Sequence, residues 1–554
     1  MPVQGQRRRA LTITRRSRPS TRAEPVEGPA ERPLMVSTME ERVLGETERP
    51  RPRDRSKIGP NASPRRPTPE LLVAAGLVVL GFSARLIATL RGSGLDGLIY
   101  YDDGVNFAAA IGLVHGQLPY RDFLLLHPPG IVLALAPFAG LAQLTSDSTG
   151  FVVARLSFMI IGGINAALVA WFLRPVGRVG ALFGGVFYAV FWPAVYNERT
   201  VLLEGLANTC LLASLIAISP PEESPTRRRV FVGGLLLGVA AAIKIWGVLP
   251  IVILFGWLVV RLGFRRASLL LAGTAASCAA ICLPFFAAAP TMMWRFVVLD
   301  QLSRVPNRTS PIGRLTEILG LGHLPPRITV PLMIALLAVA AGVVLGWQLA
   351  RARPAVLLLL GLGAMLLITP IWFIHYSALT APAIAITAGA AAQQMLNLAA
   401  ERRWRWLRIG LVVALLVAPL VAALPIALVR AGERFPRQPL AAAAAPSPGC
   451  ITSDHPSALI LTDVLSRNLR RGCPLVADLG GVSHHMAASS GDRSPRVGNV
   501  AFQQYALAYL RSGDLTMIAR FGRDDGFSAA TADTIQAWPV VAEVGQFAVR
   551  APRP

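Results

Sequence analysis

Residues 101–130 read YDDGVNFAAAIGLVHGQLPYRDFLLLHPPG, and they place two adjacent aspartates between stretches apolar enough to enter a membrane. A carboxylate near lipid is costly, so such a residue is usually paired or functional. Asp102 and Asp103 are expected to begin a helix over residues 102–115 at the outer face of the membrane. A favourable interaction with the helix dipole is the structural alternative to a role as a base or an acceptor-binding carboxylate.

The composition is that of a polytopic membrane protein. Of 554 residues, 53% are hydrophobic and 15% are charged, whereas roughly a quarter are charged in soluble domains. The formal net charge of +23 lies largely in the N-terminal tail and in short basic clusters between apolar segments. Such clusters mark cytoplasmic loops. Because they are not interleaved with aromatic residues, we expect no nucleic-acid partner.

Eleven transmembrane helices are predicted from apolar stretches of sufficient length. They are 71–90, 151–172, 179–196, 200–218, two short spans within 230–260 that meet near Lys244, 267–286, 329–349, 354–373, 375–395 and 407–429.

The apolar run 128–145 is a further candidate, and charge decides its placement. If it lies along or dips into the outer face, the basic clusters at 174–178, 227–229, 261–266, 351–353 and 401–408 all fall in the cytoplasm with the N-terminal tail. The expected fold is therefore all-α and polytopic, with about eleven spans plus an outer-face juxtamembrane helix. The N-terminus is cytoplasmic and the C-terminus extracytoplasmic.

Three domains follow from this arrangement. Residues 1–69 are rich in Arg, Pro, Glu and Ser and are expected to form a disordered cytosolic tail. Residues 70–430 form the transmembrane domain, and 431–554 form a small extracytoplasmic α/β domain with its linker.

The outer domain should contain short strands at CITSD, PLVADL and QFAVR, with helices at 456–469 and 501–511. The alanine run 441–445 is interpreted as the linker. Cys450 and Cys473 both lie in this domain, where oxidation is possible, so we expect a disulfide between them.

Several other polar residues should face the same side as the aspartates. Glu198 and Arg199 lie in the turn VYNERT (195–200) and form either a surface ion pair or part of an acceptor site. Glu204 lies within the next span and needs a partner, for which Arg199 or Arg155 could serve.

Cations are also expected at the outer face. Lys244 interrupts an apolar run and suits an anion arriving from the lipid side, such as a phosphate; snorkelling to the headgroups is the alternative. The loop 287–328 is rich in arginine, and Arg304 and Arg308 are our candidates there for donor-phosphate binding. His375 and Tyr376, at the outer end of a later span, are weaker candidates.

Residues 100–130 resemble the first outer loop of the polytopic GT-C glycosyltransferases, in the branch of protein O-mannosyltransferases and aminoarabinose transferases. Those proteins show an acidic pair, then a G…PY.D…HPP run, then a juxtamembrane helix. The matching residues here are Asp102, Asp103, Gly116, Pro119, Tyr120, Asp122, His127, Pro128 and Pro129. A G…A…K span end is similar to Gly238–Lys244, and an aromatic HY pair looks like His375 and Tyr376.

This resemblance implies an inverting glycosyltransferase that takes a sugar, hexosyl or pentosyl, from a polyprenyl-phosphate donor. It implies Asp102 as the base, with Asp103 orienting the acceptor or a metal. Tyr120, His127, Glu198, His375 and Tyr376 would then contact the acceptor or substrate, as would Arg199. YNERT replaces a clean Asp-x-Asp motif, so a Mg²⁺ or Mn²⁺ cofactor, held by the aspartate pair, stays open.

The high content of Ala, Arg, Gly and Pro indicates a GC-rich bacterial genome, which favours a plasma-membrane enzyme of cell-envelope synthesis. A glycan, a lipid or a protein is the expected acceptor. A polytopic transporter or a flippase for lipid-linked sugars is the alternative function. Such proteins often carry internal repeats with matched broken helices, and we find no convincing repeat in the sequence.

Overall fold

The computed structural model describes residues 69–220, 224–304, 309–322, 329–401, 405–428, 432, 434–490, 494–520 and 526–552. Residues 67–554 form one compact unit. The expected cytosolic tail lies, apart from Pro69, outside the described residues.

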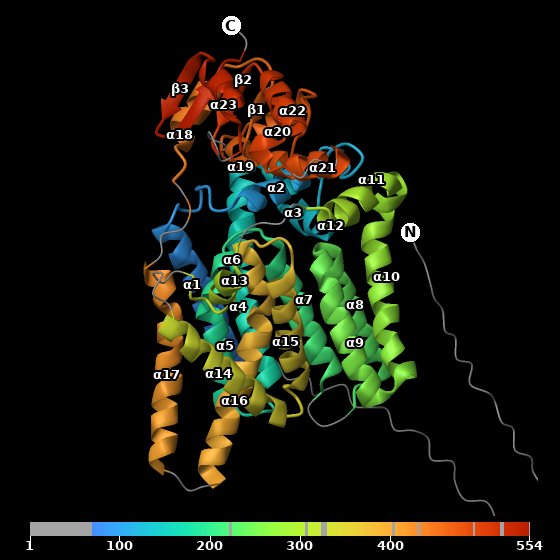
Figure 1. The fold of residues 1–554 in the computed structure, drawn as a ribbon, viewed down its shortest axis with the longest axis vertical. Coiled ribbons are helices and arrows are strands. Elements are labelled where there is room, and N and C mark those ends of the chain that lie inside the picture. Colours follow the sequence, from blue (N-terminus) through green and yellow to red (C-terminus); the bar gives the residue numbers. More distant parts are fainter. Residues whose placement is uncertain are drawn as a thin grey trace, which may run out of the picture. The chain divides into compact units, whose positions relative to one another are not determined.

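Long apolar helices form the membrane part, which identifies a membrane protein (Figure 1). Their bounds are α1 Pro69–Arg91, α4 Asp147–Leu173, α5 Arg178–Val190, α6 Trp192–Glu198, α7 Leu203–Ile218, α8 Arg227–Ile243, η1 Ile245–Gly247, α9 Val248–Leu262, α10 Phe264–Ala288, α14 Thr329–Gln348, α15 Arg353–Ile368, η3 Ile374–Thr380, α16 Ala381–Glu401 and α17 Arg405–Leu428. Each predicted span overlaps one of these helices or a consecutive pair. Five of the described helices are long and apolar enough to cross a membrane, or six if α5 and α6 form one span, so the count of eleven spans stays a prediction.

Two of the predicted spans are interrupted. Helices α5 and α6 are bent by 53° relative to each other, which turns the end of α6 back into the protein. The run 230–260 breaks at Lys244, whose extended backbone separates α8 from η1 and α9. A single charged residue within an apolar run thus marks a real break in the helix.

The segment between α1 and α4, residues 92–146, is called the outer loop here. It folds into two helices, α2 (Tyr101–Val114) and α3 (Gly130–Leu144). Between them the chain turns sharply, because Gly116 and Tyr120 adopt positive φ angles of 84° and 71° and the carboxylate of Asp122 accepts a hydrogen bond of 2.7 Å from the backbone N–H of Leu118. Helix α3 has 15 residues, fewer than the ~20 needed to cross a bilayer. It packs against α2 and α4.

A second outer segment follows α10. It contains α11 (Pro290–Trp294), the π-helical turn η2 (Arg295–Leu299), α12 (Asp300–Leu302) and α13 (Pro311–Ile318). Arg304 lies just after α12. Arg308 lies outside the described residues.

The C-terminal part is a small α/β fold. Its helices are α18 Arg437–Ala444, α19 Pro456–Leu461, α20 Leu465–Arg470, α21 Leu479–Ser490, η4 Arg496–Gly498, α22 Val500–Arg511 and α23 Ala529–Gln536. Its strands are β1 Ile451–Ser453, β2 Leu515–Ile518, β3 Val540–Val544 and β4 Phe547–Arg550, in the order β1-β2-β4-β3. Strands β1 and β2 are parallel, whereas β4 is antiparallel to both neighbours. A disulfide joins Cys450 and Cys473.

One expectation for this part is wrong. PLVADL is not a strand: residues 474–478 are irregular and lead into α21. Most of the alanine run 441–445, interpreted above as the linker, is helical and belongs to α18, in keeping with the high helix propensity of alanine.

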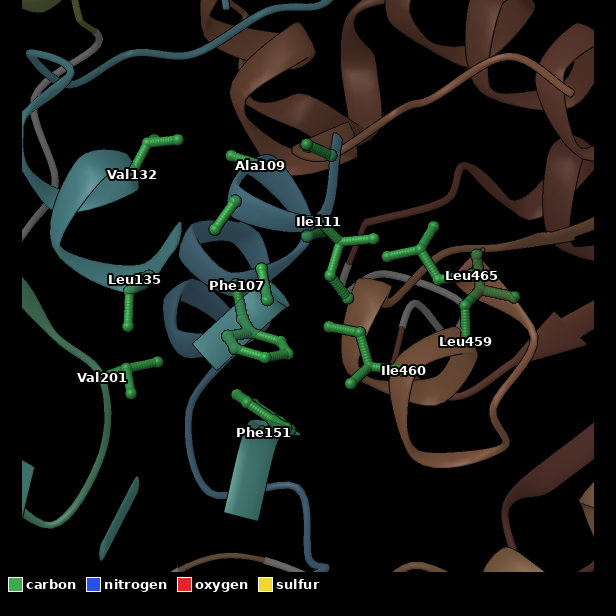
Figure 2. Close-up of a cluster of buried hydrophobic side chains, with 14 of the residues drawn as sticks. Phe107, Ala109, Ile111, Val132, Leu135, Phe151, Val201, Leu459, Ile460 and Leu465 are labelled. Carbon is green, nitrogen blue, oxygen red and sulfur yellow. The ribbon is translucent and has the colours of Figure 1, made fainter. Parts of the chain in front are cut away.

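The C-terminal part packs directly on the outer loop. Figure 2 shows one apolar core in which Phe107 and Ile111 of α2 meet Leu459, Ile460 and Leu465. Phe107 also stacks on Phe151 of α4. Burying one such aromatic ring contributes roughly 1.5–3 kcal/mol.

Polar contacts support this packing. The backbone N–H of Ser466 donates to Asp147 at 2.8 Å, and the backbone N–H of Ser148 donates to Asp463 at 2.9 Å. The outer loop is therefore held between the membrane helices and the C-terminal part.

Candidate functional site

Asp102 lines a cavity between the outer loop and the C-terminal part. The cavity has a volume of about 790 Å³. Its lining combines aromatic and polar side chains, among them Tyr100, Tyr101, Asp102, Tyr196, Phe373, His455, Arg520, Gln536, Glu543, Gln546 and Arg550. The cavity therefore offers space for a polar molecule beside a carboxylate.

The Asp102 carboxylate is enclosed yet reachable. Its side chain is 31% exposed, and the surrounding protein raises its pKa to about 6, chiefly through desolvation. The carboxylate of Asp478 raises the pKa further, whereas Arg520, Arg304 and Lys244 lower it. A carboxylate with a pKa near neutrality is suited to accept a proton in catalysis.

Asp103 points elsewhere. Its Oδ2 accepts hydrogen bonds from Nε and Nη2 of Arg155 at 3.2 and 2.7 Å, and both side chains are fully buried. Arg155 also donates to the backbone carbonyl of Gly97 at 3.0 Å. Consecutive residues of a helix project in different directions, so the two aspartates do not face the cavity together. We therefore correct the predicted role of Asp103 beside Asp102: it fixes the loop to α4.

His375 connects Asp102 to the membrane helices. Its Nε2 lies 3.9 Å from Oδ2 of Asp102 and 3.7 Å from Oε1 of Glu204. Its Nδ1 is 3.0 Å from the hydroxyl of Tyr100. A residue that the sequence marked only weakly thus lies between two carboxylates.

Lys244 forms a buried ion pair with Glu204. The ammonium also lies 4.3 Å from the centre of the Tyr376 ring, and the second oxygen of Glu204 accepts a hydrogen bond of 2.7 Å from Asn197. The prediction that Arg199 or Arg155 would pair with Glu204 is wrong. Lys244 lies near the site as expected, but its charge is already balanced by a carboxylate.

Arg304 has no ion-pair partner among the residues that the structure describes. It makes no hydrogen bond with these residues either, and its Nε is buried without an acceptor. Its guanidinium lies 6.0 Å from the centre of the Phe373 ring. Phe373 lines the cavity beside Asp102, so Arg304 lies next to the same site, and its charge lowers the pKa of Asp102, His127 and Asp478. A guanidinium without an acceptor is ready to bind an anion.

The HPP motif holds His127 near these cations. Burial lowers the pKa of His127 well below its usual value, and Lys244 and Arg304 lower it further. Nδ1 of His127 is buried without a partner among the described residues. The hydroxyl of Tyr120 donates to the backbone carbonyl of His127 at 2.7 Å, and the Tyr120 side chain is buried. Tyr120 therefore supports His127 from within the core and is not an exposed acceptor contact.

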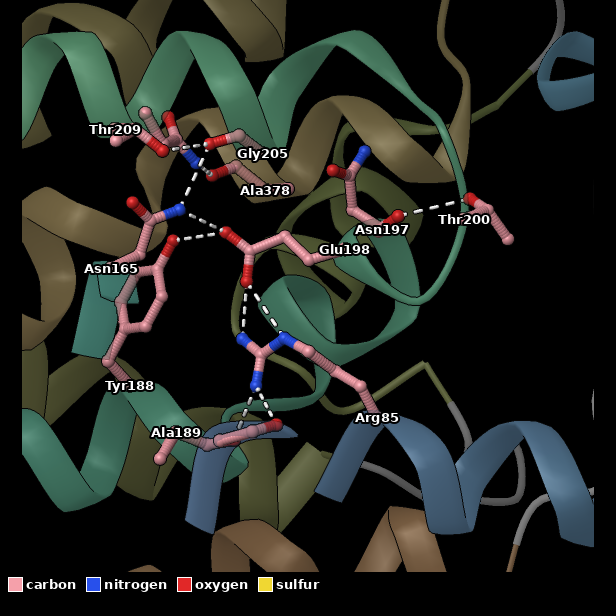
Figure 3. A network of polar contacts seen from close by, with 12 residues as sticks. Arg85, Asn165, Tyr188, Ala189, Asn197, Glu198, Thr200, Gly205, Thr209 and Ala378 are labelled. Carbon is pink, nitrogen blue, oxygen red and sulfur yellow. Dashed lines mark hydrogen bonds and ion pairs between the residues drawn. The ribbon is translucent and has the colours of Figure 1, made fainter. Parts of the chain in front are cut away.

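Glu198 belongs to a buried network rather than to an outer turn (Figure 3). One oxygen accepts hydrogen bonds from Asn165 and Tyr188, each at 2.7 Å. The other pairs with Arg85 of α1. The bend between α5 and α6 points Glu198 inward, which corrects its predicted acceptor-binding role and its predicted pairing with Arg199.

Arg199 is also fully buried. It lies over the Tyr196 ring, at 4.8 Å from the ring centre, and donates to the backbone carbonyl of Tyr196 at 3.3 Å. It therefore supports the wall of the site rather than reaching into the cavity.

The residues do not suit the metal site suggested by the aspartate pair. Asp103 is committed to Arg155, so the two carboxylates do not converge. Among the described residues, no group of three or more His, Cys, Asp or Glu side chains could hold a metal ion. We derive no step through a metal.

Tyr100, Asp478 and Arg520 are site residues that the sequence did not reveal. Asp478 and Arg520 lie more than 370 residues from Asp102 in the chain, and neither belongs to a recognisable motif. In the sequence, only its position in the aromatic pair directly before the two aspartates could have indicated that Tyr100 belongs to the site.

Comparison with known proteins supports the fold. Residues 125–370 match the family model "Glycosyltransferase family 87". No curated protein matches the sequence. ArnT from Cupriavidus metallidurans bound to undecaprenyl phosphate is similar in structure, with a TM-score of 0.53 and 18% identity over 86% of this chain and 98% of that chain.

The archaeal oligosaccharyltransferase AglB from Archaeoglobus fulgidus, in complex with an inhibitory peptide and a dolichol-phosphate, is also similar. Its TM-score is 0.53 at 11% identity, over 81% of this chain and 69% of that chain. These likenesses confirm that the chain has the fold of the GT-C glycosyltransferases, as the loop motif predicted.

Proposed function

We propose that this protein transfers a sugar from a polyprenyl-phosphate donor to an acceptor hydroxyl on the extracytoplasmic side of the plasma membrane. The observation that carries the proposal is the placement of Asp102: it is the partly exposed member of the acidic pair and lines the cavity. Structures of ArnT with undecaprenyl phosphate and of AglB with a dolichol-phosphate show the same fold, which supports a donor of this class.

In the proposed reaction the acceptor oxygen attacks the anomeric carbon of the donor. The bond between that carbon and the phosphate oxygen breaks, and polyprenyl phosphate leaves with the bonding electrons. The hydroxyl proton passes to Asp102. A well-placed general base contributes about 10²- to 10⁴-fold to the rate, and inversion at the anomeric carbon follows from a single displacement.

The leaving phosphate gains negative charge and needs a cation. Arg304 is our main candidate, because its Nε is buried without an acceptor among the described residues. Lys244 is held by Glu204, so it would act at longer range unless the phosphate competes for it. Hydrogen-bond donors that are already held in position stabilise developing negative charge most strongly where water is excluded.

The orientation of the site supports an extracytoplasmic reaction. Lys244 caps the C-terminal end of α8, whereas the basic residues 227–229 begin the same helix. The 17 residues of α8 separate these ends by about 25 Å. If the basic cluster faces the cytoplasm, the site and the C-terminal part face outward.

Transfer of radiolabelled sugar from polyprenyl-phosphate donors by the purified protein in liposomes tests the proposal. Asp102→Asn should lower the rate by about 10²- to 10⁴-fold. Asp96→Asn is the matched control, because Asp96 is an exposed carboxylate of the same outer loop and should leave transfer unchanged. Full transfer by Asp102→Asn would show that the base is wrongly assigned.

A further inference from the structure

Asp102 lies in the first turn of α2, and no side chain caps the N-terminus of this helix. Tyr100 occupies the N-cap position, and its side chain makes no capping hydrogen bond. Residues at an uncapped helix start are usually less well fixed. Something else must therefore hold Asp102 in place beside the cavity.

The neighbouring Tyr101 is held by the C-terminal part. Its hydroxyl accepts a hydrogen bond of 2.8 Å from the backbone N–H of Gly480 and bonds to the side chain of Asp478. The Arg520 guanidinium lies 4.0 Å from the centre of its ring, and the His455 ring meets it edge-on at 5.1 Å. The C-terminal part thus contacts both the hydroxyl and the ring of one side chain.

The groups that hold Tyr101 are themselves fixed. One Asp478 oxygen accepts a hydrogen bond of 2.6 Å from the backbone N–H of Gly481. The carboxylate of Asp454 accepts backbone hydrogen bonds from Ala519 and Arg520 at 2.7 and 2.9 Å. These contacts leave little freedom for the Tyr101 side chain.

We propose that Tyr101 is a positioning residue, through which Asp478 and Arg520 of the C-terminal part orient Asp102 and balance its charge. The proposal rests on the function proposed above for Asp102. Asp478 contacts the hydroxyl of Tyr101 and Arg520 contacts its ring, and the two residues carry opposite charges. Removal of either one should therefore change the proton affinity of Asp102, and the two removals should act in opposite directions.

Other charged and titratable groups also face Asp102, and they stay unchanged in the test. They come from η3, α7, α8 and the segment after α12, and are His375, Glu204, Lys244 and Arg304.

The test compares pH profiles of transfer for Asp478→Asn and Arg520→Gln. Asp478→Asn removes a negative charge, so the acidic limb should move to lower pH. Arg520→Gln removes a positive charge, so the limb should move to higher pH. Each shift should be about one pH unit. Arg511→Gln and Asp514→Asn make the same charge changes elsewhere in the C-terminal part and should leave the limb in place.

Tyr101→Phe separates the hydroxyl from the ring. It keeps the surface under Arg520 but loses the contacts with Gly480 and Asp478, so kcat should fall while KM for the donor stays unchanged. A merely structural role would lower the amount of folded enzyme without moving any pH profile.

A second measurement does not depend on activity. Carbodiimide couples to protonated carboxyl groups, so labelling of Asp102 as a function of pH, read by mass spectrometry, reports its protonation directly. Opposite shifts of this labelling curve in Asp478→Asn and Arg520→Gln support the positioning role even if sugar transfer fails. Labelling curves that coincide with the wild-type curve in both variants would overturn it.

Discussion

Replacing each of the two adjacent aspartates by asparagine should have different effects: Asp103→Asn should lower stability, whereas Asp102→Asn should lower activity. Asp103 accepts two hydrogen bonds from Arg155, and both side chains are completely buried. Asparagine keeps an acceptor but leaves the guanidinium charge buried without a counter-charge. Breaking a buried ion pair by removing one partner costs about 3–5 kcal/mol, and we expect about 3 kcal/mol because one acceptor remains.

Asp102→Asn should instead preserve stability. Desolvation raises the pKa of Asp102 to about 6, which means that folding disfavours its charged form. Below the unfolded pKa the residue is protonated in both states, and above the folded pKa the buried charge costs stability. At neutral pH a neutral amide removes this cost, so stability should be unchanged or slightly higher.

The assay measures thermal unfolding and sugar transfer on the same detergent-purified samples. Asp103→Asn should unfold several degrees below the wild type and keep transfer activity in proportion to its folded fraction and loop geometry. Asp102→Asn should unfold at the wild-type temperature and lose transfer by about 10²- to 10⁴-fold. A stable Asp103→Asn, or an unstable Asp102→Asn with normal specific activity, would refute this reading of the pair.

Three further predictions follow from the same site. Transfer should rise with pH through about 6, because Asp102 has a pKa of about 6 and accepts a proton only when ionised; a flat profile across that pH would contradict its role as base. Arg304→Ala should raise KM for the donor, and Arg304→Lys should raise it less. Donor kinetics equal to wild type in Arg304→Ala would show that Arg304 does not bind the phosphate. The disulfide between Cys450 and Cys473 closes a loop with a sequence separation of 23, so its reduction should destabilise the C-terminal part by about 3 kcal/mol. Proteolysis before and after reduction measures this loss, and unchanged resistance to the protease would contradict the prediction.

The sequence revealed the features of the fold that depend on local pattern. Apolar length predicted the span at 71–90 as α1 and that at 329–349 as α14, because crossing a bilayer requires a fixed number of apolar residues. The break at Lys244 was equally local, since one charge interrupts an apolar run.

The partners of the buried charges could not be predicted in the same way. Glu198 pairs with Arg85, which lies 113 residues earlier, and Glu204 pairs with Lys244, which lies 40 residues later. Those choices depend on how the helices are rotated and on the 53° bend between α5 and α6. A carboxylate in a span predicts that a partner exists, but not which residue it is.

The contrast between paired and unpaired charges locates the site more firmly than any single motif. Three buried ion pairs lie among the described membrane helices and the outer loop, namely Asp103–Arg155, Glu198–Arg85 and Glu204–Lys244. Arg199 and Arg314 are buried too, and they donate to backbone carbonyls. Asp102 and Arg304 are not matched in this way, although both are near the same cavity wall. Leaving a charge without a partner in a poorly solvated place costs free energy, and a fold keeps such a cost where a substrate supplies what is missing. A lipid phosphate would satisfy Arg304 and an acceptor proton would satisfy Asp102, so the two unmatched charges fit the two halves of one transfer reaction.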